Sequence, residues 1–460
     1  MGLREPLVIS SPSCVRRNGD LLTRCACRYS ALVGPLGLAW ALACTVFLLP
    51  HSLLADQPTV PSKAQISLPY GFYSEHFGLA AGYVQGVFGA PQPQASLLGT
   101  LIAGSNGSVM AFGLAKDLKT PYSDRLFVDA IGQIGYFADT VAYIDGNPAY
   151  LGQPAGSNDS AEDNFVQGDG LDAYLLLSFK YVLPIGEGRD EPMDIDRLSG
   201  GLPLPGEEDR NRVWNPLRSG RTYLELRPFY RSQEIEADYL DAELRTNGLE
   251  FAVLYDNRDF ARSPSQGSSI RARVSRDWGW ANSSREYTVY GLEADKYFSL
   301  GSSENFRQRV IALDYWTVDT PTWNDFDIVD GKPLYHRPPA YAGATLGGVF
   351  RMRGYPSSRF NDRAAVYYSV EARFIPRWNP FNEWAWLQEH LGVQWWQLVA
   401  FGEIGRVAPK WDLDELHSDM KKDVGVGVRL MAKGLVVRVD AAVSEEDYGV
   451  QMMVGQPFQF

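Results

Sequence analysis

Cysteine is confined to the first tenth of this chain of 460 residues, and histidine is scarce throughout. The four cysteines are Cys14, Cys25, Cys27 and Cys44, and only five histidines occur in the whole sequence. Cys25 and Cys27 are separated by one residue, a spacing that does not fit a zinc knuckle, and no histidine cluster lies near them. No H-E-x-x-H pattern or comparable ligand spacing is present. We therefore expect neither a metal site nor a cofactor.

Recognisable catalytic motifs are also missing. The chain has no G-x-S-x-G nucleophile elbow, and its histidines are scattered, with at least two in expected loops. The sequence therefore predicts that the protein is not an enzyme. The alternative is an outer-membrane hydrolase whose serine, histidine and aspartate come together only in the folded barrel.

Long apolar runs are absent after Ala55. No later segment approaches the ~20 apolar residues that a membrane-spanning helix needs, so a chain that crosses a membrane must do so as strands. The formal net charge of -12 argues against a nucleic-acid partner.

Residues 1–55 have the organisation of a targeting segment. Four arginines between positions 16 and 28 precede an apolar run over 31–50, and small residues lead to Ala55-Asp56. This order predicts a signal peptide over 1–55. A single transmembrane anchor helix is the alternative, which the breaks at Gly34, Pro35 and Gly37 disfavour. A true start downstream of Met1 is left open, because the stretch before the apolar run is long.

Aromatic residues and period-two alternation are abundant in the remainder. Aromatics make up 13% of the chain. In 364–374 the even positions from 366 are apolar, whereas Ser369, Glu371 and Arg373 occupy the odd ones. This is the strand signal. The same alternation recurs in segments 249–256, 270–274, 424–430 and 435–443.

Many strands with charges on their second face need a wet interior and a lipid-facing exterior. An open sheet edge in lipid would leave backbone groups unpaired, so the sheet must close. We therefore predict an all-β fold, a transmembrane antiparallel β-barrel of about 16 strands over 56–460, with girdles of aromatic residues. A soluble β-protein with aromatic cores is the alternative.

An even strand number with both ends in the periplasm fixes the sides of the connections. Segment 318–363 is then the longest external loop, and 139–167, 233–245 and 408–421 are also external. Segment 183–218 falls in the periplasm, where it is unusually long. Either a strand pair has been missed there or the segment is a periplasmic elaboration.

The external segment 318–363 holds a glycine-flanked arginine, Arg353. If the loop folds into the lumen, this guanidinium needs carboxylate partners. Glu371 on the next strand and Glu403 on the strand after it face inward and qualify, and Gly354 would allow close approach to the wall. The alternative is that Arg353 is an ordinary exposed loop arginine.

Arg353-Gly354-Tyr355 resembles the arginine-glycine-aromatic motif of the BamA/TamA-type outer-membrane assembly barrels, the bacterial surface antigen family. In that family the sixth external loop carries the motif into the barrel, where it meets an acidic residue and an F-x-D-x-G motif. Glu371 matches the first partner. Phe401, Glu403 and Gly405 match the second, with glutamate in place of aspartate.

Two further segments carry the resemblance. Tyr255-Asp256-Asn257-Arg258-Asp259 is similar to another family signature. The expected last strand, 448–460, ends in Phe458 and Phe460, which resemble the carboxy-terminal signal read by the outer-membrane assembly machinery. We expect both aromatics on one face, with the terminal one at the membrane boundary. The resemblance extends over about 246–460.

The resemblance also sets expectations for function. Family members of the transport class carry amino-terminal polypeptide-transport-associated domains, for which the stretch between Ala55 and the first strand has no room. We expect a barrel in the bacterial outer membrane that helps insert or export proteins or lipids. Its expected partners are outer-membrane lipid and lipopolysaccharide, the assembly machinery and a separate periplasmic subunit. The alternative is a passive channel or structural barrel that has lost transport.

The tryptophans near the end of the chain allow one more expectation. We predict that they anchor the barrel at the periplasmic interface, and a carbohydrate-binding platform is the alternative. They are Trp384, Trp386, Trp395 and Trp396.

Overall fold

The structure is a computed structural model that describes residues 64–74, 76–193, 198–204 and 213–458. The signal peptide predicted over 1–55 and the terminal Phe460 lie outside these residues.

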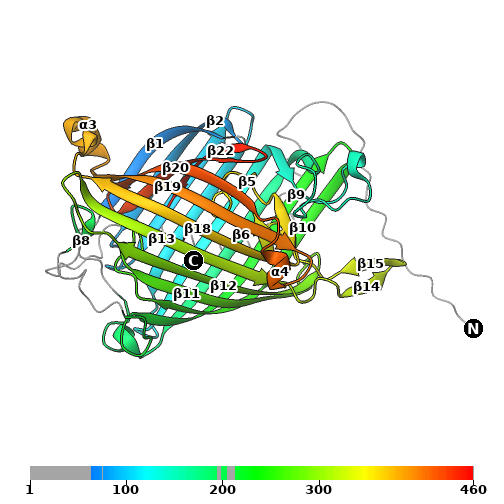
Figure 1. The fold of residues 1–460 in the computed structure, drawn as a ribbon, viewed down its shortest axis with the longest axis horizontal. Coiled ribbons are helices and arrows are strands. Elements are labelled where there is room, and N and C mark those ends of the chain that lie inside the picture. The colour runs from blue at the N-terminus through cyan, green and yellow to red at the C-terminus, as the bar shows by residue number, and fades with distance from the viewer. Residues whose placement is uncertain (1–63, 75, 194–197, 205–212, 459–460) are drawn as a thin grey trace, which may run out of the picture. The chain divides into compact units, whose positions relative to one another are not determined.

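The described chain forms a barrel wall of sixteen strands, each hydrogen-bonded to the next along the sequence (Figure 1). All ladders are antiparallel. The wall strands are β1 (Ala64–Ser74), β2 (Gly78–Phe88), β3 (Ser96–Gly104), β4 (Val109–Lys119), β5 (Leu126–Ala142), β6 (Val166–Val182), β9 (Arg221–Ala237), β10 (Leu240–Asp256), β11 (Gly267–Trp278), β12 (Glu286–Ser299), β13 (Phe306–Asp319), β18 (Ala364–Pro376), β19 (Val393–Ala408), β20 (Lys421–Ala432), β21 (Leu435–Ser444) and β22 (Tyr448–Val454).

Shorter elements lie in the connections. The extra strands are β7 (Leu198–Ser199), β8 (Leu202–Pro203), β14 (Phe326–Val329), β15 (Lys332–Tyr335), β16 (Ala344–Leu346) and β17 (Phe360–Asp362). The helical turns are η1 (Pro148–Tyr150), η2 (Gly186–Arg189), η3 (Pro380–Glu383), α3 (Ala385–His390) and α4 (Leu413–Leu416). Among the described residues, helices are too short and too polar to cross a bilayer.

The predicted all-β class, the antiparallel barrel and the strand number are confirmed. One expected external loop, 233–245, is wrong. β9 and β10 are 17 residues each and run on to a two-residue turn at 238–239. The segment is polar, which is why it read as a loop. A strand that extends beyond the lipid has both faces in water, so it needs no apolar positions there.

The barrel wall has an outer face toward the lipid and an inner face toward the lumen, as the period-two alternation of its strands predicts. On β19, Leu398 and Ile404 point outward and are about two-fifths exposed, whereas Gln397 and Glu403 point inward and are buried. β20 repeats the pattern, with Val424 and Val426 exposed on the outside. An apolar exterior around a charged interior is the arrangement of an outer-membrane barrel.

The wall has a seam between its first and last strands. No backbone ladder joins β1 to β22 among the described residues, although every other neighbouring pair of wall strands has one. Near one end, Ile66, Phe88 and Leu98 instead form a buried apolar cluster against which Leu435 packs. Side-chain packing, rather than a hydrogen-bonded ladder, therefore closes the barrel at this place.

The last strand is shorter than the predicted 448–460. β22 ends at Val454, and Gly455 follows with a φ of 103°. Pro457 has no N–H to give to a ladder, so the strand cannot continue. Phe458 lies inside the barrel, 1% exposed, in an apolar cluster with Tyr297 of β12. Phe458 therefore does not lie on a face of the last strand as expected, because the strand ends before it.

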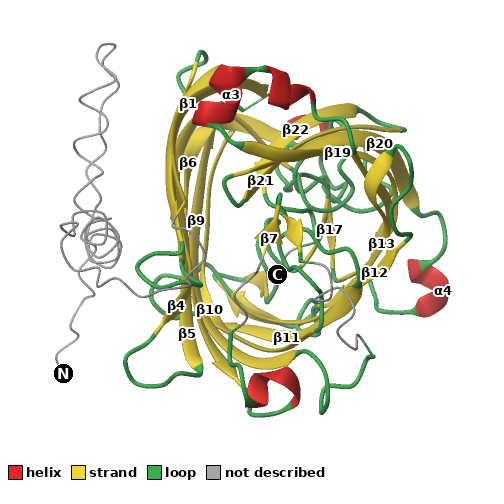
Figure 2. Ribbon diagram, turned by 90° about the vertical axis from the view of Figure 1, so that its left-hand side faces the viewer, coloured by secondary structure: helices red, strands yellow, loops and turns green. Residues whose placement is uncertain are grey.

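The described part of segment 183–218 adds no strand to the barrel wall. It contains η2 and the small β7–β8 hairpin. Figure 2 shows β7 inside the ring of wall strands. Trp384 is exposed, as an interfacial anchor would be, but Trp395 points inward and is 1% exposed, so it cannot anchor the barrel at the lipid interface.

Candidate functional site

The long connection between β13 and β18, residues 320–363, folds back into the barrel. It contains the two-stranded β16–β17 sheet, which lies inside the ring in Figure 2. An apolar cluster joins the loop to the inner wall. Its members are Tyr287, Val289, Trp316, Val318, Ala344, Leu346, Met352, Tyr355, Phe360, Ala365, Tyr367 and Val407.

A glycine turn presents Arg353 to the wall. Gly347 and Gly348 have φ values of 107° and 101°, a backbone conformation that residues with a side chain rarely adopt. The Gly347 N–H donates to the Arg351 carbonyl at 3.0 Å, and the Tyr355 N–H donates to the Met352 carbonyl at 3.0 Å. The turn thereby places the Arg353 side chain, which is 0% exposed, among inward-facing groups of the wall.

Glu403 of β19 makes the most extensive contact with Arg353. Its carboxylate accepts the Arg353 backbone N–H at 2.6 Å and the side-chain Nε–H at 3.1 Å. The Tyr367 hydroxyl also donates to it. One carboxylate therefore holds both the backbone and the side chain of the arginine, which fixes the position of the turn.

Two more carboxylates complete the shell around Arg353. Asp440 of β21 accepts from Nη1 at 2.7 Å. Glu371 of β18 lies 2.9 Å from Nη2, an ion pair without an aligned hydrogen bond. The guanidinium carbon lies 3.4 Å from the ring centroid of Phe401, close enough for a cation–π interaction. Three strands and a ring thus hold one side chain.

The carboxylates keep Arg353 charged. Burial would lower the pKa of its guanidinium, but Glu403, Glu371 and Asp440 outweigh burial and hold that pKa well above its ordinary value. The ion pairs therefore persist at any pH at which the carboxylates are ionised.

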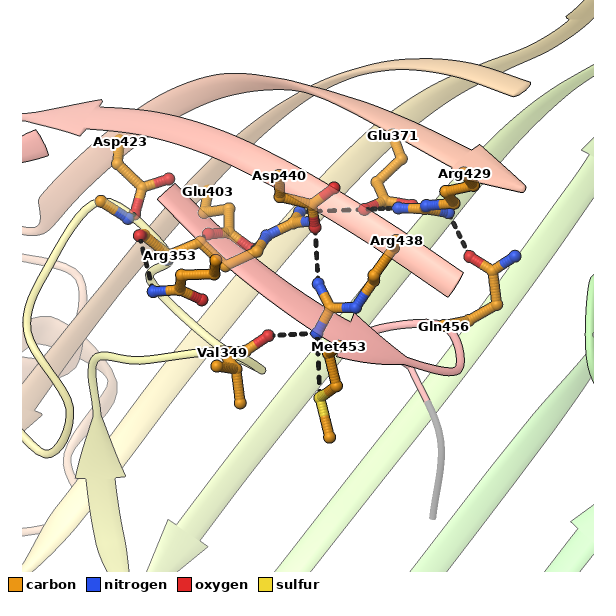
Figure 3. A network of polar contacts seen from close by, with 12 residues as sticks. Val349, Arg353, Glu371, Glu403, Asp423, Arg429, Arg438, Asp440, Met453 and Gln456 are labelled. Atoms are coloured by element: carbon orange, nitrogen blue, oxygen red, sulfur yellow. Dashed lines mark hydrogen bonds and ion pairs between the residues drawn. The ribbon is translucent and has the colours of Figure 1, made fainter. Parts of the chain in front are cut away.

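Other arginines bind the same carboxylates from the wall side (Figure 3). Arg429 and Arg373 contact Glu371 at 2.8 Å and 2.7 Å. Arg438 donates to Asp440 at 2.5 Å. We call the eight residues together the lumen cluster. Its members are Arg353, Glu371, Arg373, Glu403, Asp423, Arg429, Arg438 and Asp440.

Gly354 and Tyr355 continue the contact beside Arg353. The Gly354 N–H donates to Asp423 Oδ2 at 2.9 Å, and the Tyr355 hydroxyl donates to the Lys422 carbonyl at 3.2 Å. A Cβ on Gly354 would lie 2.7 Å from the Asp423 Cβ and 3.0 Å from the Val443 carbonyl carbon. Gly405 is less confined, since a Cβ there would lie 2.9 Å from Leu346 Cδ1 and 3.1 Å from the Val366 carbonyl oxygen.

We expect Gly354→Ala to destabilise the barrel by about 1–3 kcal/mol, because its methyl group would overpack against backbone that cannot move aside. The measurement is the urea midpoint of the barrel folded into phospholipid vesicles.

Gly113→Ala on β4 is the matched control, since a Cβ at Gly113 meets nothing within 4 Å. An equal shift for the two variants would show that the loop does not lie against β20 and β21 as described.

The structure brings together the residues that the sequence singled out in this loop and its wall. Arg353 meets Glu371, Phe401 and Glu403, and Gly354 and Tyr355 contact β20. Asp440, Asp423 and Arg438 were missed as partners. The alternation in 435–443 places Arg438 and Asp440 on the inward face of their strand, and this signal could have identified them as partners. Phe458 lies elsewhere in the lumen, with its ring 5.3 Å from the Arg373 guanidinium.

Comparisons with known proteins find likeness in structure alone. No family model matches the chain, and no curated protein does. CdiB from Escherichia coli matches with a TM-score of 0.51 at 10% identity, over 87% of this chain and 63% of that one. BamA from Haemophilus ducreyi lacking POTRA domains 1-3 matches with a TM-score of 0.43 at 13% identity, over 85% of this chain and 69% of that one. CdiB from Acinetobacter baumannii matches with a TM-score of 0.45 at 8% identity, over 85% of this chain and 59% of that one.

The likeness to Escherichia coli CdiB confirms the predicted resemblance at the level of the barrel fold. The chain spans less than two thirds of the length of either CdiB. The apolar exterior of the sixteen-stranded wall, around a charged interior, is the arrangement of an outer-membrane barrel. The predicted outer-membrane location is confirmed through this fold.

Proposed function

We propose that this barrel helps insert or export proteins at the bacterial outer membrane, and that clients pair with the edge of β1. The observation that carries the proposal is the seam. β1 has 11 residues and β22 only 7, and no backbone ladder joins them in the described part of the chain. An unpaired strand edge is a template for another strand.

The seam is weakest where the last strand leaves the wall. After Val454 the chain turns into the lumen, so that near this end β1 faces β21 through the cluster of Ile66 and Leu435. Separating apolar side chains there breaks no ladder hydrogen bonds. Opening at this place therefore costs less than opening between any other two wall strands.

The lumen cluster has a structural part in this proposal. An arginine held by β18, β19 and β21 ties the loop to the wall strands near the seam. This keeps the carboxy-terminal side of the barrel rigid while β1 moves. Outer-membrane lipid, lipopolysaccharide and a separate periplasmic subunit remain proposed partners, as does the assembly machinery that would insert this barrel.

A passive channel is the second candidate, which the filling of the lumen disfavours. The loop, the tail that carries Phe458 and the β7–β8 hairpin all lie inside the ring of strands. We further propose that the protein is not an enzyme.

Photo-crosslinking from the seam tests the proposal. A photoreactive phenylalanine analogue is placed at Gln65, an exposed residue of β1, and in a matched variant at Leu226, an outward residue on the same half of β9. We expect adducts with newly made outer-membrane proteins from position 65 and none from position 226. Absence of adducts at 65, or equal adducts at both, would refute strand pairing at β1.

A further inference from the structure

We propose that the β7–β8 hairpin is a displaceable seal over the periplasmic mouth of the lumen. Leu198 and Leu202 of the hairpin pack against a buried cluster on the inner wall. The cluster residues come from the ends of four wall strands and one turn. They are Phe260, Ile375, Trp395, Met431 and Val436.

The location of this cluster defines the mouth. Ile375 lies one residue before the end of β18, Met431 one before the end of β20 and Val436 one after the start of β21. These strand ends meet the connections that the topology places in the periplasm. Figure 1 shows β8 at the same end of the barrel as α3, and Figure 2 shows β7 within the ring. The hairpin therefore lies within the ring at that end, against the inner wall.

Two glycines form the turn of the hairpin. Gly200 and Gly201 have φ values of 55° and 76°, as a two-residue turn with both central residues left-handed requires. The Gly201 carbonyl accepts from the Trp395 indole N–H at 2.8 Å, and a Cβ on Gly201 would lie 2.8 Å from that indole nitrogen. The turn thus fits the wall closely.

Among the described residues, the hairpin contacts the wall through two leucines and its turn. Leu198 and Leu202 are only partly buried, and polar contacts to the turn come from Trp395 and from Arg307, 3.4 Å from the Gly200 carbonyl. A short hairpin outside the barrel ladder can open locally at a free energy below that of global unfolding. Anything that enters the lumen past the ends of β18 to β21 has to displace it, whether the barrel conducts solutes or handles proteins.

Thiol accessibility tests the seal. Val436, which is 3% exposed under the hairpin, is changed to cysteine in a full chain whose four native cysteines are serine. The rate of reaction with a water-soluble, membrane-impermeant maleimide is compared with that of Tyr122→Cys, at a side chain that is 90% exposed. We expect Val436→Cys to react at least about tenfold more slowly, because it reacts only when the hairpin opens.

Crowding the turn should then open the mouth. In the Val436→Cys background, Gly201→Val should raise the labelling rate at least about tenfold, since its side chain collides with Trp395. The matched control is Gly331→Val at the tip of β14–β15, where φ is 75° and a Cβ meets nothing within 4 Å. It carries the same backbone strain and should leave the rate unchanged.

Gel migration without boiling shows that each variant barrel is folded. If Gly201→Val does not fold, Leu202→Ser decides, because it removes apolar contact without crowding and should also accelerate labelling. The seal is refuted if Val436→Cys reacts as fast as Tyr122→Cys. It is equally refuted if the folded hairpin variant labels no faster than its parent, or if Gly331→Val accelerates labelling as much as Gly201→Val.

Discussion

Arg353→Ala should destabilise the folded barrel by about 3–5 kcal/mol, because removing one partner of a buried ion pair leaves the other charge uncompensated. Arg353, Glu371 and Glu403 are each 0–1% exposed, so water does not screen them. The loss of the positive charge affects Glu403 most, because Glu371 still pairs with Arg373 and Arg429. Asp440 still pairs with Arg438. Urea unfolding in phospholipid vesicles measures the loss.

The control is Arg363→Ala in the same loop. Arg363 pairs with Asp319 at 3.1 Å, but both side chains are about one quarter exposed. Such a pair contributes less than about 1 kcal/mol. Equal losses for Arg353→Ala and Arg363→Ala would contradict the burial of the lumen cluster.

A double-mutant cycle identifies the partner. Combining Arg353→Ala with Glu403→Gln should cost less than the sum of the single changes, with a coupling of about 2 kcal/mol, since residues in one ion-pair network are not additive. Strict additivity would show that Arg353 and Glu403 do not interact.

Phe458→Ala should cost about 3 kcal/mol, which is the range for a buried phenylalanine whose removal leaves a cavity. Phe458 is 1% exposed, packs with Tyr297, Val310 and Ala312, and lies 5.3 Å from the Arg373 guanidinium. The same unfolding measurement in vesicles applies.

Tyr122→Ala serves as its control, because Tyr122 is 90% exposed in the connection between β4 and β5 and should change stability by less than about 0.5 kcal/mol. If Phe458→Ala behaves like Tyr122→Ala, the tail does not lie in the lumen, and the seam loses the feature that shortens β22.

The barrel could be predicted from the sequence because period two is a local signal. Each strand with one lipid face and one wet face shows it within a few residues, as 364–374 does. The partners Glu371 and Glu403 could be proposed because they lie on inward positions of the two strands after the loop.

The remaining partners depend on geometry across the barrel. Asp440 and Asp423 reach Arg353 and Gly354 only because β20 and β21 curve around to the loop. Alternation alone gives the face of a side chain and leaves its distance from a loop open. The end of the last strand, by contrast, could have been predicted from the sequence, because Gly455 and Pro457 both interrupt a strand.

The most direct test of the proposed function is depletion of this protein from the cell that makes it. The measurement is the fraction of newly made outer-membrane barrels that migrate as folded species in unboiled samples. We expect that fraction to fall and unfolded barrels to accumulate, with recovery when the wild-type chain is restored. An unchanged folded fraction, together with altered permeability to small solutes, would contradict the assembly function and establish the channel instead.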